Sequence, residues 1–196
     1  MHGYRYTAHE NAAAEIAREI GFTQVSVSNQ VSPLMKLVSR GDTTVVDAYL
    51  SPILRRYVDQ VAGELGGVKL MFMQSNGGLT DAAKFQGKDA ILSGPAGGVV
   101  GMVRTAEMDG FNQVIGFDMG GTSTDVALLE GAIRLTNQGK VGAYPVAIPM
   151  ADIHTIGAGG GSIAYVDAGG LLQVGPSSAG ANPGPACYSQ GGRAPT

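Results

Sequence analysis

Two aspartates flank a short glycine-rich segment near the middle of the chain, a pattern typical of a site for phosphate and a divalent cation. The segment reads Asp118-Met119-Gly120-Gly121-Thr122-Ser123-Thr124-Asp125. Glycines let the backbone bend sharply and approach a ligand, and successive N–H groups with nearby hydroxyls form a concavity for anionic oxygens. A carboxylate can hold a hydrated Mg²⁺ that in turn binds phosphate. The alternative is an ordinary glycine-rich hairpin with acidic ends.

The apolar residues around this segment predict the elements that position it. Residues 114–129 indicate a strand, a tight turn and a second strand, because the flanking residues are apolar and β-prone. The spacing matches neither the P-loop nor the Rossmann fingerprint, since no Gly-Lys-Ser/Thr follows and a strand comes after the turn. A helix at 99–108, with glycines on its first turns, is expected just before this hairpin.

A second group of polar residues, Asp152 and His154, precedes the glycine-rich loop 157–161. Alternate residues of a strand share one face, so a strand at 152–156 would point both side chains the same way. Such a pair could bind a divalent metal, orient one another or perform acid–base chemistry. The alternative is a hydrogen bond that only satisfies two half-buried polar groups.

A third group, Gln74, Ser75 and Asn76, follows the apolar run 68–73. That run predicts a buried central strand, and open α/β sheets bind ligands where their strands end. These three residues are therefore candidate ligand contacts. An Asn-Gly turn without a ligand explains them equally well.

The remaining elements are predicted from periodicity and from turn residues. A helix is expected at 8–20, closed by Gly21, and a strand at 24–28. A long helix at 40–65 would begin with Asp42 or Thr43 as N-cap, and Pro52 would kink it or break it near Leu50. Further strands are expected at 131–136 and 141–148, and a hairpin joins strands 163–166 and 171–174.

The composition restricts the class of protein. A hydrophobic fraction of 44% and a charged fraction of 15% over 196 residues are typical of a globular chain. A net charge of −3 without a Lys/Arg cluster argues against a nucleic-acid or membrane partner. The single cysteine, Cys187, excludes an internal disulfide and a cysteine-based zinc site. With no apolar run near about 18 residues, we expect a cytoplasmic protein.

Several motifs, in order along nearly the whole chain, resemble the hydantoinase A / 5-oxoprolinase family; they lie at 40–50, 73–79, 92–99, 118–126, 155–164 and 174–188. The resemblance implies an α/β, actin-like ATPase (ribonuclease H-like) fold, with a mixed sheet, flanking helices and glycine-rich hairpins in the second half. It implies that residues 1–85 are the C-terminal part of the N-terminal hydantoinase region. Residues 86–196 would begin the hydantoinase A ATPase core, with its phosphate hairpin at 114–129.

The resemblance also implies a function. Family members use ATP to phosphorylate an amide oxygen and so hydrolyse a cyclic amide: hydantoin, N-methylhydantoin or 5-oxoproline. Sister proteins are subunits of acetone- and acetophenone-type carboxylases, and a nucleotide-binding module without its own chemistry is a third possibility. ATP and Mg²⁺, or another divalent metal, would be the cofactors. A hydantoinase B-type subunit or domain would be the protein partner.

The roles that the resemblance implies for single residues fall into three groups. Asp118 would hold the metal, and Asp125 would orient the metal shell or the attacking group. The phosphates would be bound by Gly120, Gly121, Thr122, Ser123, Gly159 and Gly160. Asp152 and His154 would contact metal or substrate, His154 with a catalytic role.

Family members carry an additional phosphate hairpin of the type Asp-x-Gly-Gly-Thr-x-Thr-Asp, which the residues before Tyr4 cannot supply. They also continue past Thr196. We therefore expect the chain to be a middle portion of a larger enzyme and to be inactive by itself.

Overall fold

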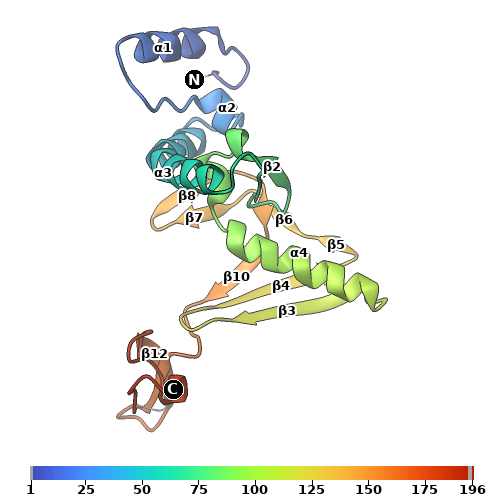
Figure 1. Ribbon diagram of the computed structural model, residues 1–196, viewed down its shortest axis with the longest axis vertical. Helices are drawn as coiled ribbons and strands as arrows, with labels where there is room; N and C mark the ends of the chain where they lie inside the picture. The colour runs from blue at the N-terminus through green and yellow to red at the C-terminus, as the bar shows by residue number, and fades with distance from the viewer. Residues whose placement is uncertain (1, 194–195) are drawn as a thin grey trace. The chain divides into compact units, whose positions relative to one another are not determined.

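The computed structural model describes residues 2–193 and 196, with most helices in the first half of the chain and most strands in the second half (Figure 1). Two compact units are present. The first runs to Val100 and includes Arg134–Ala151; the second comprises Gly101–Ile133 and Asp152–Thr196. The predicted α/β class is confirmed, and the strand pairs among the described residues are antiparallel.

The first unit begins with helices α1 (Ala8–Glu19) and α2 (Ser28–Val31). Helix α1 agrees with the prediction, and Gly21 follows it with φ +102°. The predicted strand at 24–28 is wrong, because Ser28 starts α2 and the preceding residues pair with no strand. The Ser26 hydroxyl donates to Asp47 of the next long helix (2.6 Å), so the segment is held against a helix, which offers no ladder to pair with.

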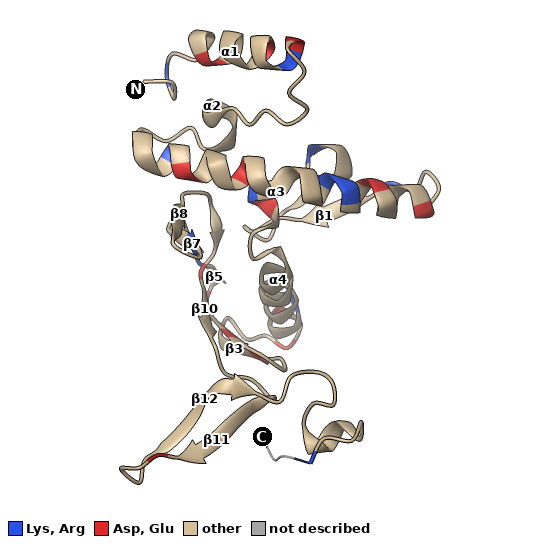
Figure 2. Ribbon diagram, turned by 90° about the vertical axis from the view of Figure 1, so that its left-hand side faces the viewer, with Lys and Arg blue, Asp and Glu red and all other residues tan. Residues whose placement is uncertain are grey.

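Helix α3 spans Leu37–Glu64, and Figure 2 shows acidic and basic residues interspersed along it. The predicted N-cap at Asp42 or Thr43 is wrong. Thr43 is fully buried and donates its hydroxyl to the Ser39 carbonyl (2.6 Å), one turn earlier in the helix. The predicted break near Leu50 is also wrong, since the helix continues through Pro52. The helix is stabilised on both sides of the proline by tertiary packing, since Val46 precedes Pro52, Val58 follows it and both are buried.

A short hairpin follows α3 and consists of β1 (Met71–Met73) and β2 (Leu79–Asp81). The prediction of a buried central strand at 68–73 is therefore wrong: the strand is shorter and belongs to a two-stranded sheet. The chain turns back because Asn76 accepts the Gly78 N–H (2.8 Å) and Gly77 adopts φ +82°. Two 3-10 turns, η1 (Ala82–Lys84) and η2 (Gly87–Ala90), complete this segment.

The core of the first unit lies between α3 and two small strand pairs. β6 (Leu135–Thr136) pairs with β9 (Met150–Ala151), and β7 (Gly139–Val141) pairs with β8 (Tyr144–Val146). The predicted strands in this region thus occur as shorter pieces. The buried apolar cluster consists of Val46, Val146, Ile148 and Met150.

In the second unit, β10 (Ile153–Ile156), β4 (Thr124–Glu130) and β3 (Gln113–Met119) lie side by side, and β5 (Ala132–Ile133) pairs with β4 (Figure 1). The predicted hairpin at 114–129 is confirmed. Helix α4 spans Ser93–Met108 and thus begins six residues earlier than the predicted start at residue 99. Pro95 is compatible with this helix because it lies in the first turn. Met102 of α4 packs against Gly116 so closely that a Cβ there would overlap the sulfur.

The chain ends with a second hairpin and an irregular segment. β11 (Ser162–Val166) pairs with β12 (Leu172–Ser178), as predicted, and η3 (Ala186–Tyr188) follows. Asp167 accepts the N–H groups of Gly169 and Leu171 at 2.9 and 3.0 Å and so fixes the hairpin turn. Among the described helices, none is both long and apolar enough to cross a membrane.

Candidate functional site

Asp118 and Asp125 are direct partners in the antiparallel register of β3 and β4. Directly opposed residues point to the same face of a sheet. The two carboxylates therefore lie on one face, at the end of the hairpin that carries the glycine-rich turn. The Gly120 N–H donates to the Ser123 carbonyl (2.9 Å) and closes this turn.

The glycine loop 157–161 braces the turn from one side. The N–H groups of Gly160 and Gly161 donate to the carbonyls of Gly120 and Gly121 at 2.9 and 2.7 Å. These two glycine-rich motifs are therefore brought together by backbone hydrogen bonds, although more than thirty residues of sequence separate them.

This bracing orients the free N–H groups of the turn. In a trans peptide the C=O and N–H bonds point in opposite directions, and cis bonds occur only before Pro176 and Pro183 among the described residues. Because the Gly120 and Gly121 carbonyls point to the glycine loop, the N–H groups of Gly121 and Thr122 point away from it. Both residues are exposed, and neither N–H donates to a described residue. Adjacent N–H groups of this kind can bind anionic oxygens.

Close backbone contact explains why residue 159 is a glycine. A Cβ at Gly159 would lie 2.6 Å from the Gly120 carbonyl oxygen and 2.8 Å from the Thr122 nitrogen. Thr124 adds a further support, since its buried hydroxyl donates to the Ala158 carbonyl (2.7 Å). The Thr124 hydroxyl thus holds the loop and does not face a ligand, contrary to the expected concavity of three hydroxyls.

Strand β10 adds Thr155 to the face that carries the aspartates. Thr155 is the register partner of Asp125, and its hydroxyl donates to that carboxylate (2.6 Å). His154 is the partner of Val126 and therefore lies on the opposite face. The sequence pattern indicated His154 and not Thr155, because the sequence of one strand does not reveal the pairing register that decides between neighbouring residues.

Asp152 lies between β9 and β10 and belongs to neither strand. The predicted strand at 152–156 is thus one residue too long, and the shared face expected for Asp152 and His154 does not follow. No group of three or more His, Cys, Asp or Glu residues that could hold a metal ion occurs in the described part of the chain. The expected metal set of Asp118, Asp152 and His154 is therefore not gathered.

The Gln74–Asn76 group lines a cavity of about 230 Å³ in the first unit, together with Lys88 and Asp89. The buried Ser75 hydroxyl donates to the Asp89 carbonyl (2.8 Å), and the Ser75 carbonyl accepts the Ala151 N–H (2.7 Å). Lys88 pairs with Asp89 at 2.7 Å. These bonds give Ser75 a structural role, and Asn76 forms the Asn-Gly turn that was the alternative to a ligand contact.

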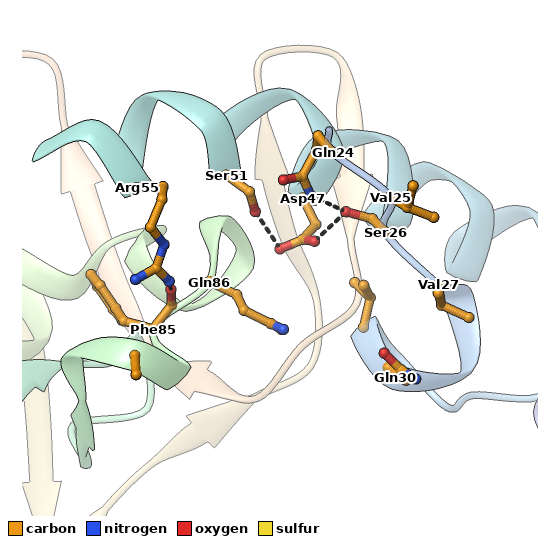
Figure 3. Close-up of a pocket in the computed structure, with 12 residues that line it drawn as sticks. Gln24, Val25, Ser26, Val27, Gln30, Asp47, Ser51, Arg55, Phe85 and Gln86 are labelled. Atoms are coloured by element: carbon orange, nitrogen blue, oxygen red, sulfur yellow. Dashed lines mark hydrogen bonds between the residues drawn. The ribbon is translucent and has the colours of Figure 1, made fainter. Parts of the chain in front are cut away.

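A second polar cavity, of about 190 Å³, lies beside Asp47 of α3 (Figure 3). Asp47 is only 2% exposed, yet it accepts hydrogen bonds from the Ser26 hydroxyl, the Ser51 hydroxyl and the Lys88 N–H at 2.6, 3.3 and 2.9 Å. Both carboxylate oxygens are thus satisfied within the protein. This network joins residues 24–27, α3 and η2, and we assign it to stability.

Comparison with known proteins identifies relatives over the whole chain. The family model described as hydantoinase/oxoprolinase matches residues 40–196. The 5-oxoprolinase of Saccharomyces cerevisiae is 45% identical over 197 residues, which are 98% of this chain and 15% of that protein. The caprolactamase subunit alpha of Pseudomonas jessenii is 40% identical over 200 residues, which are 98% of this chain and 29% of that protein.

Two solved structures contain the same fold. The ATP-dependent caprolactamase from Pseudomonas jessenii matches with a TM-score of 0.82 and 40% identity, over 99% of this chain and 29% of that one. The nucleotide-free structure of acetone carboxylase matches with a TM-score of 0.77 and 26% identity, over 100% of this chain and 29% of that one. The chain thus spans 15% to 29% of the length of these relatives.

Proposed function

Because the chain belongs to the hydantoinase/oxoprolinase family, we propose that its parent protein is an enzyme that uses ATP to hydrolyse a cyclic amide. The substrates would be hydantoin, N-methylhydantoin, 5-oxoproline or a related lactam. Two relatives with 40% to 45% identity, a 5-oxoprolinase and a caprolactamase, support this class by their names. The crystal structure of the caprolactamase is that of an ATP-dependent enzyme, which supports ATP as the nucleotide.

The braced hairpin turn is the observation that carries the proposal. It directs the Gly121 and Thr122 N–H groups outward at the end of β3 and β4, where Asp118 and Asp125 share a face. In the proposal these N–H groups bind phosphate oxygens of ATP, with Ser123 at the same turn. The glycines of the loop, Gly159 and Gly160, shape the site from behind. The Gly160 N–H donates to the Gly120 carbonyl, and the backbone of Gly159 packs directly against the turn. In the proposal both glycines hold the turn in place and neither binds a phosphate.

Magnesium fits the carboxylates that are present. Mg²⁺ prefers oxygen ligands and keeps several waters, so one or two carboxylates and a phosphate are sufficient. Asp118 and Asp125 supply such oxygens, and the Thr155 hydroxyl fixes one orientation of Asp125. Bound Mg²⁺ would neutralise charge on the phosphates. We propose these two aspartates, in place of Asp152 and His154, as the carboxylates that face the nucleotide.

The chemistry that follows is phosphoryl transfer to the amide oxygen. The terminal phosphoryl group would move from ATP to this oxygen, with ADP as the leaving group, which makes the amide carbon a better electrophile for water. Addition of water and cleavage of the ring C–N bond, with a proton passing to the ring nitrogen, would then open the ring. Hydrolysis of the resulting acyl phosphate would release inorganic phosphate and the carboxylate. Catalysis of phosphoryl transfer consists mainly of positioning and charge neutralisation, and the turn and the aspartates are suited to both.

A carboxylase subunit is the second candidate function. The acetone carboxylase structure matches the whole chain, at lower identity than the caprolactamase. In this case ATP would activate a ketone or bicarbonate, and the same hairpin would hold the phosphates. The higher identity to the cyclic amide hydrolases favours the first candidate.

The parent protein would also need a partner of the hydantoinase B type, as a subunit or as a further domain. The name "subunit alpha" of the caprolactamase relative supports this part of the proposal. The region assignment given above, with residues 1–85 and 86–196 in successive regions of the parent, is likewise part of the proposal.

The test is a substrate screen with the purified parent protein and its partner. ATP hydrolysis would be measured with 5-oxoproline, hydantoin, caprolactam, or acetone plus bicarbonate, and the organic product would be identified by mass spectrometry. We expect a cyclic amide to stimulate ADP release together with formation of the ring-opened product. ADP release with carboxylation of the ketone would select the second candidate, and stimulation by none would contradict both.

A further inference from the structure

The segment after β12 folds back onto the glycine loop that braces the hairpin. The Ala179 N–H donates to the Gly161 carbonyl (2.8 Å), and the Thr196 hydroxyl donates to the Gly160 carbonyl (2.6 Å). All of these residues belong to the second unit. Ala179 and Thr196 are therefore held against the glycine loop.

Within this segment the Tyr188 ring lies directly on the backbone of Gly184. Gly184 has φ +73°, and a Cβ there would lie 2.6 Å from the Tyr188 ring. The buried Pro185 begins the turn η3, whose Tyr188 N–H donates to the Pro185 carbonyl (3.0 Å). Ser189 then ends η3 in the left-handed conformation, with φ +57°. The backbone on both sides thus fixes the direction of the tyrosine side chain.

This direction places the Tyr188 hydroxyl beside the hairpin turn. A Cβ at Gly121 would lie 3.4 Å from the hydroxyl oxygen. The hydroxyl makes no hydrogen bond to the described residues, and the ring remains 44% exposed. Gly121 is also one of the two residues whose N–H groups point outward. An unused phenol hydroxyl and two unused backbone donors therefore lie at the same turn.

We infer that Tyr188 is a ligand-binding residue, whose hydroxyl donates a hydrogen bond to a phosphate oxygen of the nucleotide. The inference rests on the proposed function, since it names a further contact of the same phosphate site. A phenol can donate one hydrogen bond, and donation to an anionic oxygen is stronger than donation to a neutral one. The segment that follows β12 thus becomes one wall of the site.

The experiment compares Tyr188→Phe with Tyr165→Phe in the parent protein. Both changes remove one hydroxyl and keep the ring. Tyr165 lies on β11 and is 49% exposed, and its hydroxyl makes no hydrogen bond to the described residues. Calorimetry would measure the Kd of Mg-ATP and of magnesium tripolyphosphate, which lacks ribose and base. We expect Tyr188→Phe to raise the Kd of both ligands by the same factor, about 10- to 100-fold. Tyr165→Phe should change neither by more than about twofold.

Asp118→Asn is included to separate this inference from the proposed function. If Asp118→Asn weakens Mg-ATP binding and Tyr188→Phe does not, the role of Tyr188 is overturned and the hairpin site stands. If Tyr188→Phe weakens the binding of Mg-ATP but not that of magnesium tripolyphosphate, the proposed phosphate contact is overturned. If neither variant affects ATP binding, the phosphate site itself is contradicted. Equal unfolding midpoints of the two tyrosine variants would exclude misfolding as the cause.

Discussion

Asp118 and Asp125 face each other directly across β3 and β4, so two negative charges share one face of the sheet beside an anion-binding turn. Like charges in opposed positions destabilise a strand pair. A pair of residues that lowers the stability of the fold is expected where the function of the protein requires both side chains. The repulsion would be relieved when a divalent cation binds between the carboxylates and the phosphates.

The first prediction follows from this repulsion. Asp118→Asn and Asp125→Asn should each raise the free energy of unfolding by about 0.2–1 kcal/mol in the absence of metal and nucleotide. The same variants should lower ATP-dependent turnover of the parent protein about 100-fold or more, because charge neutralisation at the phosphates is lost. Denaturant unfolding and a coupled ADP assay would measure the two effects.

Asp109→Asn is the matched control, because Asp109 is exposed in the segment that leads from α4 to β3. It should change neither turnover nor stability appreciably. Variants of Asp118 and Asp125 that retain full turnover would contradict the assignment of these carboxylates.

The second prediction concerns the buried carboxylate of Asp47. Asp47→Ala leaves the Lys88 N–H and the Ser26 and Ser51 hydroxyls without their acceptor. The loss should destabilise the protein by about 2–4 kcal/mol, since a fully buried donor that loses its partner costs about 1–3 kcal/mol and these three donors are only partly buried. Asp59→Ala, an exposed position of the same helix, should stay within about 0.5 kcal/mol. Urea unfolding monitored by circular dichroism would show the difference, and equal midpoints would refute the structural role.

The third prediction is a pH dependence at Glu10. Partial burial raises the pKa of this carboxyl, but hydrogen bonds from Ser28 and Asn29 and the charge of Arg40 outweigh it and lower the pKa below its usual 4.5. A carboxyl with a lowered pKa stabilises the fold above the unfolded-state value, and this contribution is lost as the pH falls through the folded-state value. Glu10→Gln should therefore lower the unfolding midpoint at pH 7 and have a smaller effect below about pH 4. A difference that grows on acidification would contradict the account.

The hairpin 114–129 could be predicted from sequence because its pattern is local. Runs of apolar, β-prone residues define the two strands, and Gly120 and Gly121 mark the turn between them. The strand expected at 24–28 rested on alternating apolar residues, but Ser26 binds Asp47, about twenty residues away, and the segment lies against a helix. Long-range side-chain bonds of this kind have no local signal. The start of α3 was missed for a different reason: the Thr43 hydroxyl bonds to the Ser39 carbonyl one turn earlier, so Thr43 lies inside the helix and does not cap it.

The candidate site was predictable in its parts and not in its assembly. The glycine motifs and the aspartates were recognised one by one, whereas their contact depends on hydrogen bonds between segments far apart in sequence. A shift of one residue in strand register reverses the face of a side chain. For this reason Thr155, and not His154, lies with Asp125. Tyr188 ends the motif at 174–188, but nothing in that motif indicates that its hydroxyl lies beside Gly121.

The most direct test of the phosphate site is a pair of glycine substitutions in the bracing loop. Gly159→Ala places a Cβ 2.6 Å from the Gly120 carbonyl oxygen and must displace the hairpin turn, whereas a Cβ at Gly157 meets nothing within 4 Å. Calorimetric titration of Mg-ATP into the parent protein would compare the two variants with the wild type. We predict that Gly159→Ala weakens binding about 10-fold or more and that Gly157→Ala leaves it unchanged. Equal affinity of both variants and the wild type would contradict the claim that this turn holds the phosphates.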